Sequence, residues 1–288
     1  MLFSKELLAR AESLYIPSWR RSRSYQRGER TGIKKGASLE FSDYREYLQG
    51  DDLRNIDWSV YARSERLFLK IFLEEQSKNV YFVVDASESM KFGSPSKFEY
   101  ALSLAALLTY SCLRHYDRPR ILLARKDRFQ NLPIRSRKEF FSILPLLEKE
   151  KCQGEIEWNH TIRRIAYSRF PHGVFFLLSD FYSSPGFDSL KRLSALGNEL
   201  RCLQILSKEE ISPEIRGDLR LLDCESADQS EVSITSAMLK RYQNALAELQ
   251  SRIKSAAQSG GGSFYAISSN VDLSTVVFQT LRAAGVLA

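Results

Sequence analysis

The sequence predicts an α/β protein whose mostly parallel, Rossmann-like sheet is covered by helices on both faces, and three observations lead to this prediction. Residues 80–84 and 174–178 are apolar runs without a polar break, which is typical of strands buried on both faces of a parallel sheet. Segments with strand and helix patterns alternate through most of the chain. A hydrophobic content of 43% over 288 residues is enough for a substantial core.

The N-terminal part, residues 1–38, is expected to contain a short helix over residues 4–14, ended by Pro17, and then a basic arm. Residues 1–40 hold nine Lys or Arg against four Glu, so they carry +5 of the net charge of +7. Such an arm could bind nucleic acid, acidic lipid or an acidic protein, or could simply be solvated. Only Trp19 and Tyr25 accompany the arginines, which disfavours a single-strand nucleic-acid binder.

Residues 39–78 form a second part, dense in charge and in aromatic side chains. Residues 50–52, Gly-Asp-Asp, have turn chemistry. Five residues are candidates for a partner-binding or structural loop: Asp51, Asp52, Arg54, Asp57 and Trp58. Paired carboxylates can do acid–base work, but a rigid loop pinned by Asp–Arg bonds and by Trp58 is the favoured interpretation. Residues 66–75 alternate as in a strand, which we expect to pair antiparallel with the next strand at the start of the sheet.

Residues 79–288 are expected to form the α/β domain. Its strands are predicted at residues 80–84, 120–124, 174–178, 202–206, 219–222 and 264–267. Its helices are predicted at residues 96–113, from 136 to a kink or break at Pro145, 161–170 with Asn159 as cap, 187–200, 236–258 and 273–281.

Composition excludes several classes of protein. No stretch approaches ~18 uninterrupted apolar residues, so no transmembrane helix is expected. Charged side chains interrupt residues 1–16, so no signal peptide is expected there. The four cysteines form no Cys-x-x-Cys pair, which excludes a zinc ribbon and a redox motif. Reduced thiols in a cytoplasmic protein are the simplest account.

Two of the buried strands end in an aspartate, Asp85 and Asp180. The carboxyl ends of parallel strands meet at the same edge of a sheet, where ligands bind in open α/β folds. Ser87 and Ser89 follow Asp85, and Thr161 stands at the start of a helix between the two strands. Carboxylate and hydroxyl oxygens suit a hard cation such as Mg²⁺. The aspartate and serines could instead turn the chain or cap the next helix.

The order Asp, Ser, Ser, Thr, Asp resembles the metal-ion-dependent adhesion site of von Willebrand factor A domains. The resemblance implies Mg²⁺, or else Mn²⁺ or Ca²⁺, held by Asp85, Ser87, Ser89, Thr161 and Asp180. It also implies an open coordination position that accepts a carboxylate from a protein partner. The pattern departs at Thr161, because glycine usually precedes this threonine, whereas here Asn159 and His160 do. His160 itself is expected to be a surface or capping group.

A longer resemblance covers roughly residues 30–288. Residues 40–47 (EFSDYREY), 50–58 (GDDLRNIDW), 62–63 (AR) and 85–90 (DASESM) look like the bacterial family known as domain of unknown function 58. The match continues more weakly through residues 178–181 and 219–225 and the helix that contains Tyr242. The resemblance implies a von Willebrand A-like fold, a MoxR-type AAA+ ATPase as partner, and no established enzymatic activity. Many members carry membrane helices ahead of this region, so membrane-bound von Willebrand A proteins are a second class of expected partner.

Catalytic motifs are missing from the sequence. It contains neither a Gly-x-Ser-x-Gly elbow nor a P-loop, and its three histidines fit no metalloprotease pattern. An aspartyl-phosphate phosphatase usually has a second carboxylate where this chain has Ser87. We therefore predict a non-enzymatic, metal-dependent interaction module. The family resemblance implies that it acts with a MoxR-type AAA+ ATPase in the assembly or maturation of other proteins. The alternatives are binding of nucleic acid or an acidic surface through the basic arm, and a Mg²⁺-dependent hydrolase that uses Asp85.

Overall fold

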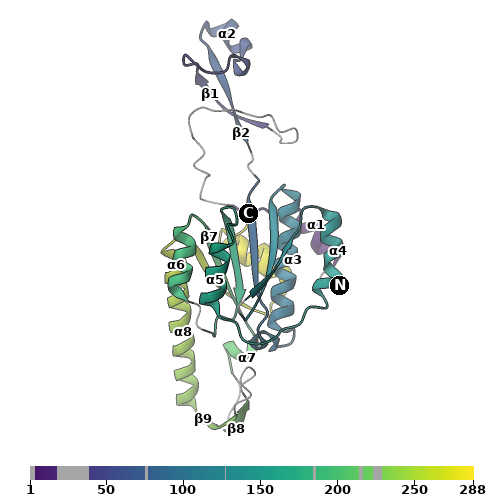
Figure 1. The fold of residues 1–288 in the computed structure, drawn as a ribbon, viewed down its shortest axis with the longest axis vertical. Coiled ribbons are helices and arrows are strands. Elements are labelled where there is room, and N and C mark those ends of the chain that lie inside the picture. The colour runs from purple at the N-terminus through teal and green to yellow at the C-terminus, as the bar shows by residue number, and fades with distance from the viewer. Residues whose placement is uncertain are drawn as a thin grey trace. The chain divides into compact units, whose positions relative to one another are not determined.

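The computed structural model describes residues 4–17, 39–74, 77–126, 128–183, 186–213, 217–222 and 229–288 (Figure 1). The chain divides into two compact units, which are described separately. Unit 1 comprises Met1–Arg21 and Lys78–Ala288, and unit 2 comprises Ser22–Ser77. The expected basic arm and Cys224 lie outside the described residues.

A six-stranded sheet forms the centre of unit 1, with the strand order β10-β7-β6-β3-β4-β5. Its strands are β3 (Asn79–Asp85), β4 (Arg118–Arg125), β5 (Arg128–Pro133), β6 (Gly173–Ser179), β7 (Glu199–Leu206) and β10 (Ser263–Ser268). Neighbouring strands are parallel except for β5, which pairs antiparallel with β4 at the edge. The predicted fold class, a mostly parallel α/β sheet, is therefore confirmed.

The apolar runs that predicted the sheet form its two central strands, β3 and β6. Residues 80–84 and 174–178 are at most 2% exposed, as expected for strands covered on both faces. The strands pair in register from Asn79 opposite Gly173 to Val84 opposite Leu178. This register fixes which residues meet where the two strands end.

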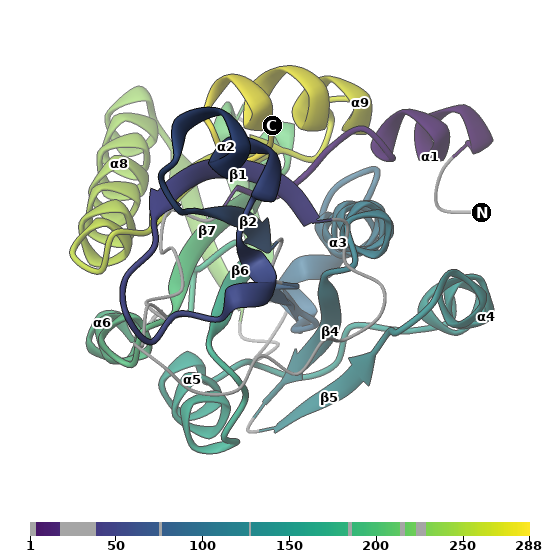
Figure 2. The same ribbon diagram turned by 90° about the horizontal axis from the view of Figure 1, so that it is seen from above.

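Helices cover both faces of this sheet (Figure 2). On one face lie α1 (Lys5–Ala11), α3 (Lys97–Arg114), α4 (Arg137–Leu147), and α9 (Leu273–Thr275) with the π-helical turn η3 (Val276–Leu281). On the other lie α5 (Trp158–Tyr167), α6 (Phe187–Ala195) and α8 (Ser236–Gln258). Alternate residues of β3 divide between the two cores, because successive side chains of a strand point to opposite faces.

Several element boundaries differ from the sequence prediction. The strand β5 was missed because its side chains are mostly exposed and show no apolar run. The helix α6 ends at Ala195, well before residue 200, since Gly197 adopts a φ of 93° and β7 begins at Glu199. The helix α4 continues through Pro145 instead of breaking there.

Two short elements in the C-terminal half were not predicted. The first is the four-residue helix α7 (Lys208–Ile211), which follows β7 directly. The second is the strand β9 (Gln229–Ile234), which pairs with the predicted strand β8 (Gly217–Leu222) in a separate two-stranded sheet.

Unit 2 contains β1 (Leu39–Glu46), the turn η1 (Leu53–Asn55), α2 (Trp58–Ser64) and β2 (Phe68–Glu74). The strand β2 exists as predicted, but its expected pairing with the next strand is wrong. It pairs antiparallel with β1, from Glu46 opposite Phe68 to Leu39 opposite Glu74. The strand β3 is instead flanked by β4 and β6.

The chain leaves unit 1 and re-enters it at neighbouring points. The ammonium of Lys78 donates a hydrogen bond of 2.8 Å to the carbonyl of Ile16. Close by in the sequence, Tyr15 and Ala288 exchange two backbone hydrogen bonds of 3.0 Å. The buried Arg201 guanidinium donates to the carbonyls of Pro17 and Val286. The N-terminal segment is thus fastened to the core just before the chain departs.

Candidate functional site

Two aspartates meet at the carboxyl ends of the two central strands. Asp85 is the last residue of β3, and Asp180 directly follows β6. Because Val84 is the register partner of Leu178, Asp85 stands opposite Ser179, one residue before Asp180. The exposed fraction is 0% for Asp85 and 1% for Asp180. The register of β3 and β6 therefore brings these two carboxylates to the same edge of the sheet, as expected.

The Asp85 carboxylate is oriented by two hydrogen bonds. Its Oδ1 accepts from the Ser87 amide at 2.9 Å, and its Oδ2 accepts from the Ser179 hydroxyl at 2.6 Å. The Ser179 oxygen in turn accepts from the amide of Phe181 at 2.9 Å. Phe181 has a φ of 57°, a left-handed conformation that is uncommon for such a residue and that recurs at functional sites.

The serine hydroxyls that follow Asp85 face each other. The distance between Ser87 Oγ and Ser89 Oγ is 3.1 Å. Ser87 precedes the turn η2 (Glu88–Lys91) but makes no side-chain cap bond to it. Ser87 therefore does not cap the next helix, which was the alternative role for these serines. Asp85 does stabilise the turn of the chain, because it accepts a hydrogen bond from the Ser87 amide. We call Asp85, Ser87, Ser89 and Asp180 the carboxyl-end site.

Electrostatics at the carboxyl-end site oppose ionisation of Asp85. Burial, followed by the nearby negative charge of Asp180, raises the pKa of Asp85 from 3.8 to about 7. The hydrogen bonds from Ser179 and Ser87 lower the pKa but do not outweigh these two causes. Each carboxylate oxygen has two lone pairs, so an oxygen that accepts one hydrogen bond keeps further acceptor capacity.

Thr161 lies deeper in its helix than the sequence predicted. The helix α5 begins at Trp158, so Thr161 is its fourth residue, and Asn159 does not cap it. Asn159 accepts instead from the Ser189 hydroxyl at 2.9 Å. Thr161 is fully buried, and its hydroxyl makes a long contact of 3.5 Å with the Lys126 carbonyl. His160 is exposed, as expected.

The first turn of α5 is nevertheless close to the end of β6. The rings of Trp158 and Phe181 pack with centroids 5.6 Å apart, and both side chains are fully buried. Phe181 directly follows Asp180 in the chain. The structure thus joins Asp85, Ser87, Ser89 and Asp180 by direct contacts or charge interaction, and it places Thr161 in a neighbouring turn.

Sequence reasoning missed a cation beside Asp180. The ammonium of Lys97, at the start of α3, lies 2.7 Å from Asp180 Oδ2 and 2.7 Å from Glu210 Oε1 in α7. Burial by itself lowers the pKa of Lys97, but the two carboxylates outweigh burial and raise it. A lysine beside a cap serine gives no sign of being buried. The pattern Ser207-x-x-Glu210, a capping box that the structure contains, could have revealed α7.

The residues of the carboxyl-end site fit a hard divalent cation. Two buried carboxylates and two hydroxyls converge. A dication would offset both the burial of the Asp85 charge and its repulsion by Asp180, the two causes that raise the Asp85 pKa. Within the described ranges no three His, Cys, Asp or Glu side chains cluster as a metal-binding group. Binding would therefore depend on the serine hydroxyls and on Thr161, alongside Asp85 and Asp180.

The aspartates of unit 2 are engaged in local structure. Asp51 accepts from Arg45 and from the Leu48 amide, both at 2.9 Å, and chiefly the Arg45 bond lowers its pKa. Asp57 caps α2 by accepting from the Ser59 amide at 2.9 Å. The expected network around Arg54 is smaller than predicted, since Arg54 contacts Asp52, at 3.4 Å, whereas Asp51 pairs with Arg45.

Trp58 does not pin this loop. Its side chain is 61% exposed, and Tyr61, one helical turn further, is 42% exposed. The two rings pack edge to face with centroids 6.0 Å apart. Leu48 and Leu53 nearby in the sequence are also more than half exposed. The prediction that Trp58 anchors the loop is therefore wrong, because the hydrogen bonds of Asp51 and Asp57 hold it instead.

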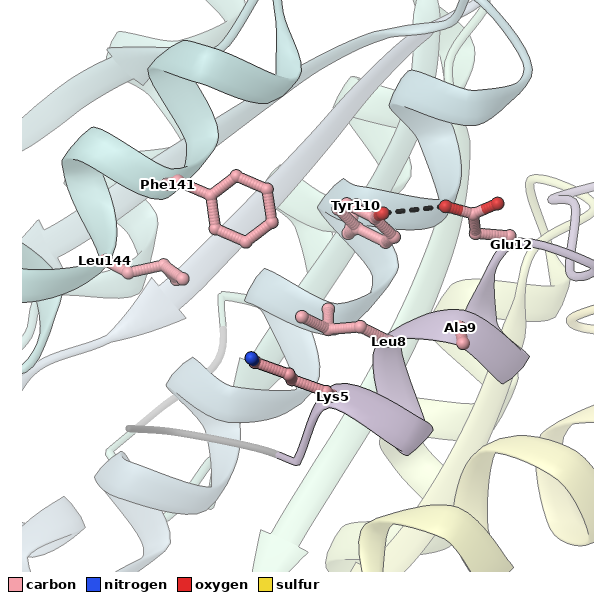
Figure 3. Close-up of a pocket in the computed structure, with 7 residues that line it drawn as sticks. All are labelled: Lys5, Leu8, Ala9, Glu12, Tyr110, Phe141 and Leu144. Carbon is pink, nitrogen blue, oxygen red and sulfur yellow. Dashed lines mark hydrogen bonds between the residues drawn. The ribbon is translucent and has the colours of Figure 1, made fainter.

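A hollow at the other end of α3 is apolar. It is lined by Lys5, Leu8, Ala9, Glu12, Tyr110, Phe141 and Leu144 (Figure 3). The Tyr110 hydroxyl donates to Glu12 at 2.7 Å. Tyr110 is 13 residues from Lys97 along the helix, which is roughly 20 Å at 1.5 Å per residue. The hollow is therefore separate from the carboxyl-end site.

Fold and site together define an α/β protein with an oxygen-rich site at the carboxyl ends of its central strands. The chain belongs to the family described as "Protein of unknown function DUF58", which matches residues 43–252. Among its relatives are the uncharacterized proteins Mb1516 of Mycobacterium bovis and Rv1480 of Mycobacterium tuberculosis. Each is 24% identical over 226 residues, which is 76% of this chain and 71% of the relative.

Two solved structures are similar to the chain. One is the conserved hypothetical protein BatB from Bacteroides thetaiotaomicron, with a TM-score of 0.46 and 15% identity. The other is an aerotolerance-related membrane protein from Bacteroides fragilis, with a TM-score of 0.47 and 19% identity. Each similarity covers 73% of this chain and 98% of the other. In the part of this chain that the structure describes, no helix is both long and apolar enough to span a membrane.

Proposed function

We propose that this protein is a non-enzymatic interaction module with a von Willebrand A-like fold that binds a protein partner through a metal ion at the carboxyl-end site. The observation that carries the proposal is the meeting of two buried carboxylates beside two serine hydroxyls, with the pKa of Asp85 raised to about 7. Asp85, Ser87, Ser89 and Asp180 would hold Mg²⁺, with Thr161 as a further ligand. A bound dication would supply an open, Lewis-acidic position for a carboxylate of the partner.

The protein's own residues prepare this site. The Ser179 hydroxyl and the Ser87 amide fix the direction of the Asp85 carboxylate. The two carboxylates would balance the charge of a dication, and neutral hydroxyls would complete the set, so the ion could still accept a carboxylate of an acidic partner. Resemblance to the family favours a MoxR-type AAA+ ATPase as this partner, with membrane-bound von Willebrand A proteins as a second class. The buried free thiols of Cys112, Cys152 and Cys202 suit a reducing compartment.

The test combines metal binding with capture of the partner. Purified wild type and Asp85→Ala are titrated with Mn²⁺, which is followed by its free-ion EPR signal. Both are then used to retain the purified MoxR-type ATPase of the same organism, with Mg²⁺ or with EDTA. We expect wild type to bind the ion and to retain the ATPase only with Mg²⁺, and Asp85→Ala to do neither.

Asp188→Ala is the matched control, since it removes an aspartate of unit 1 that lies in the first turn of α6. It should behave as wild type. Equal retention by wild type and Asp85→Ala, with or without EDTA, would refute metal-dependent binding. Turnover of a phosphate ester that required Asp85 would instead favour a hydrolase.

A further inference from the structure

Lys97 occupies a position that helix formation does not explain. It is the first residue of α3, yet its side chain is 1% exposed. Lysine is almost never fully buried unless it is paired. At the start of a helix its positive charge also faces the positive end of the helix macrodipole, which is unfavourable. Because burial and the helix macrodipole both disfavour a positive charge here, we expect the charge of Lys97 to have a function.

The ammonium of Lys97 pairs with a carboxylate oxygen of Asp180, which is also a proposed ligand of the metal ion. Asp180 Oδ1 accepts from the Tyr182 amide at 3.1 Å, whereas Oδ2 lies 2.7 Å from Lys97 Nζ. Mg²⁺ binds carboxylate oxygen at about 2.1 Å. An ion bound directly to Oδ2 would therefore lie within about 5 Å of the ammonium, where like charges in a buried site repel each other strongly.

The second partner of Lys97 connects it to α7. Glu210 Oε1 contacts the ammonium, while Glu210 Oε2 accepts from the Ser207 amide at 2.7 Å and closes the capping box. The Glu210 carbonyl accepts from the Tyr242 hydroxyl at 2.7 Å. Lys97 is thus a bridge between Asp180 at the end of β6 and the helix that follows β7.

On the basis of the proposed metal site, we propose that Lys97 competes with the metal ion for Asp180 and thereby couples occupation of the site to α7. With Asp180 engaged by a metal ion, the ammonium would keep Glu210 alone, and the bridge to α7 would open. In the structure Lys97 contacts both Asp180 and Glu210, so the bridge is closed.

The local charge also predicts selectivity. With all groups ionised, Asp85, Asp180 and Glu210 contribute three negative charges and Lys97 one positive charge, which leaves two negative charges. A dication neutralises them. A monovalent ion carries no more charge than the ammonium it must displace, so Na⁺ and K⁺ should not open the bridge.

The experiment compares Mn²⁺ affinity in wild type and in the double variant Lys97→Met/Glu210→Gln. The double variant removes one positive and one negative charge together, so its net charge equals that of wild type. Glutamine retains the capping box, and no unpaired Glu210 carboxylate remains to hinder folding. Lys91→Met is the control, since it removes an exposed lysine from the Asp85 loop that contacts Glu88 rather than Asp180.

We expect the double variant to bind Mn²⁺ at least tenfold more tightly than wild type, and Lys91→Met to remain within about threefold. Mn²⁺ should also speed amide exchange of Ile211 and Ser212, whose amides bond within α7, in wild type but not in the double variant. Equal affinity of wild type and the double variant would overturn the competition and leave the metal site standing. Failure of every variant to bind Mn²⁺ would overturn the metal site as well.

Discussion

The two units of the protein use aspartate in opposite ways. In unit 2 Asp51 is partly exposed and accepts two hydrogen bonds, one of them from Arg45, and its pKa is lowered. In unit 1 Asp85 is fully buried, accepts two hydrogen bonds from neutral donors, and its pKa is raised. The difference lies in the compensation of charge, because an arginine satisfies Asp51 whereas Asp85 faces a second carboxylate. Within the carboxyl-end site the uncompensated charge is that of Asp85, since Asp180 is paired with Lys97, and a buried carboxylate left in this way is a candidate for binding a cation.

The largest effect should come from Asp85→Asn, which tests the uncompensated charge directly. The unfolded chain ionises Asp85 near pH 3.8 and the folded protein near pH 7, so metal-free wild type should lose stability as pH rises through this window. At about 1.4 kcal/mol per pKa unit, the loss is at most roughly 4 kcal/mol. Urea unfolding in EDTA at pH 5 and pH 8 should detect about 3 kcal/mol of this loss, since the part below pH 5 lies outside the comparison. Asp85→Asn should lack this component, and the same pH slope in both proteins would contradict the assignment.

Asp57→Ala tests the structural role of the aspartates in unit 2. Asp57 is 5% exposed and caps α2, so its loss should destabilise that helix by about 1–2 kcal/mol. Amide exchange of Tyr61 and Glu65, whose amides bond to the Asp57 and Tyr61 carbonyls, reports the change. Asp52→Ala, which removes the cap of the three-residue turn η1, should cost less than about 0.5 kcal/mol. An equal cost for both variants would mean that the cap is not what Asp57 contributes.

Ser87→Ala separates binding from stability within unit 1. The Ser87 hydroxyl contacts Ser89 Oγ and lowers the pKa of Asp85, but it bonds to no helix amide, so the fold should tolerate its loss. Metal affinity should fall about tenfold, equivalent to about 1.4 kcal/mol, as measured by Mn²⁺ titration. Ser103→Ala removes another buried serine hydroxyl, one that bonds within α3, and should leave the affinity unchanged. If the two variants bind Mn²⁺ alike, Ser87 is no ligand.

Trp58→Ala should have the smallest effect on folding. Its side chain is 61% exposed, so stability should change by less than about 0.5 kcal/mol in urea unfolding. Exposed Trp and Tyr are common in binding hot spots, so retention of the ATPase should weaken if this face of α2 also contacts it. Tyr167→Ala, at an 82% exposed tyrosine of α5, is the control and should alter neither quantity.

Local patterns were enough to predict the central sheet and the meeting of Asp85 with Asp180. An unbroken apolar run identifies a buried strand, and the register of parallel strands then brings their ends together. The 23-residue helix α8 was predicted with its observed bounds, residues 236–258, because its apolar stripe is long and periodic and glycines follow it.

Features that depend on contacts distant in sequence could not be predicted. The strand β5 is an edge strand whose exposed side chains have no apolar signature. Lys97 is 83 residues from Asp180 and 113 from Glu210, and nothing near it in the sequence indicates that pairing. The exposure of Trp58 was also not predicted. A tryptophan in a charged loop is expected to anchor it, but here the hydrogen bonds of Asp51 and Asp57 are enough to hold the loop.

The hydrogen bond from Lys78 to Ile16 suggests that unit 2 could be removed or replaced at the level of the gene. Ile16 and Lys78 of unit 1 are in contact, so residues 22–77, which make up unit 2, form an insertion between two segments that already meet. Excising them and joining the two segments with a few glycines and serines should leave the carboxyl-end site intact. The same two segments could carry a foreign domain, turning unit 1 into a host scaffold.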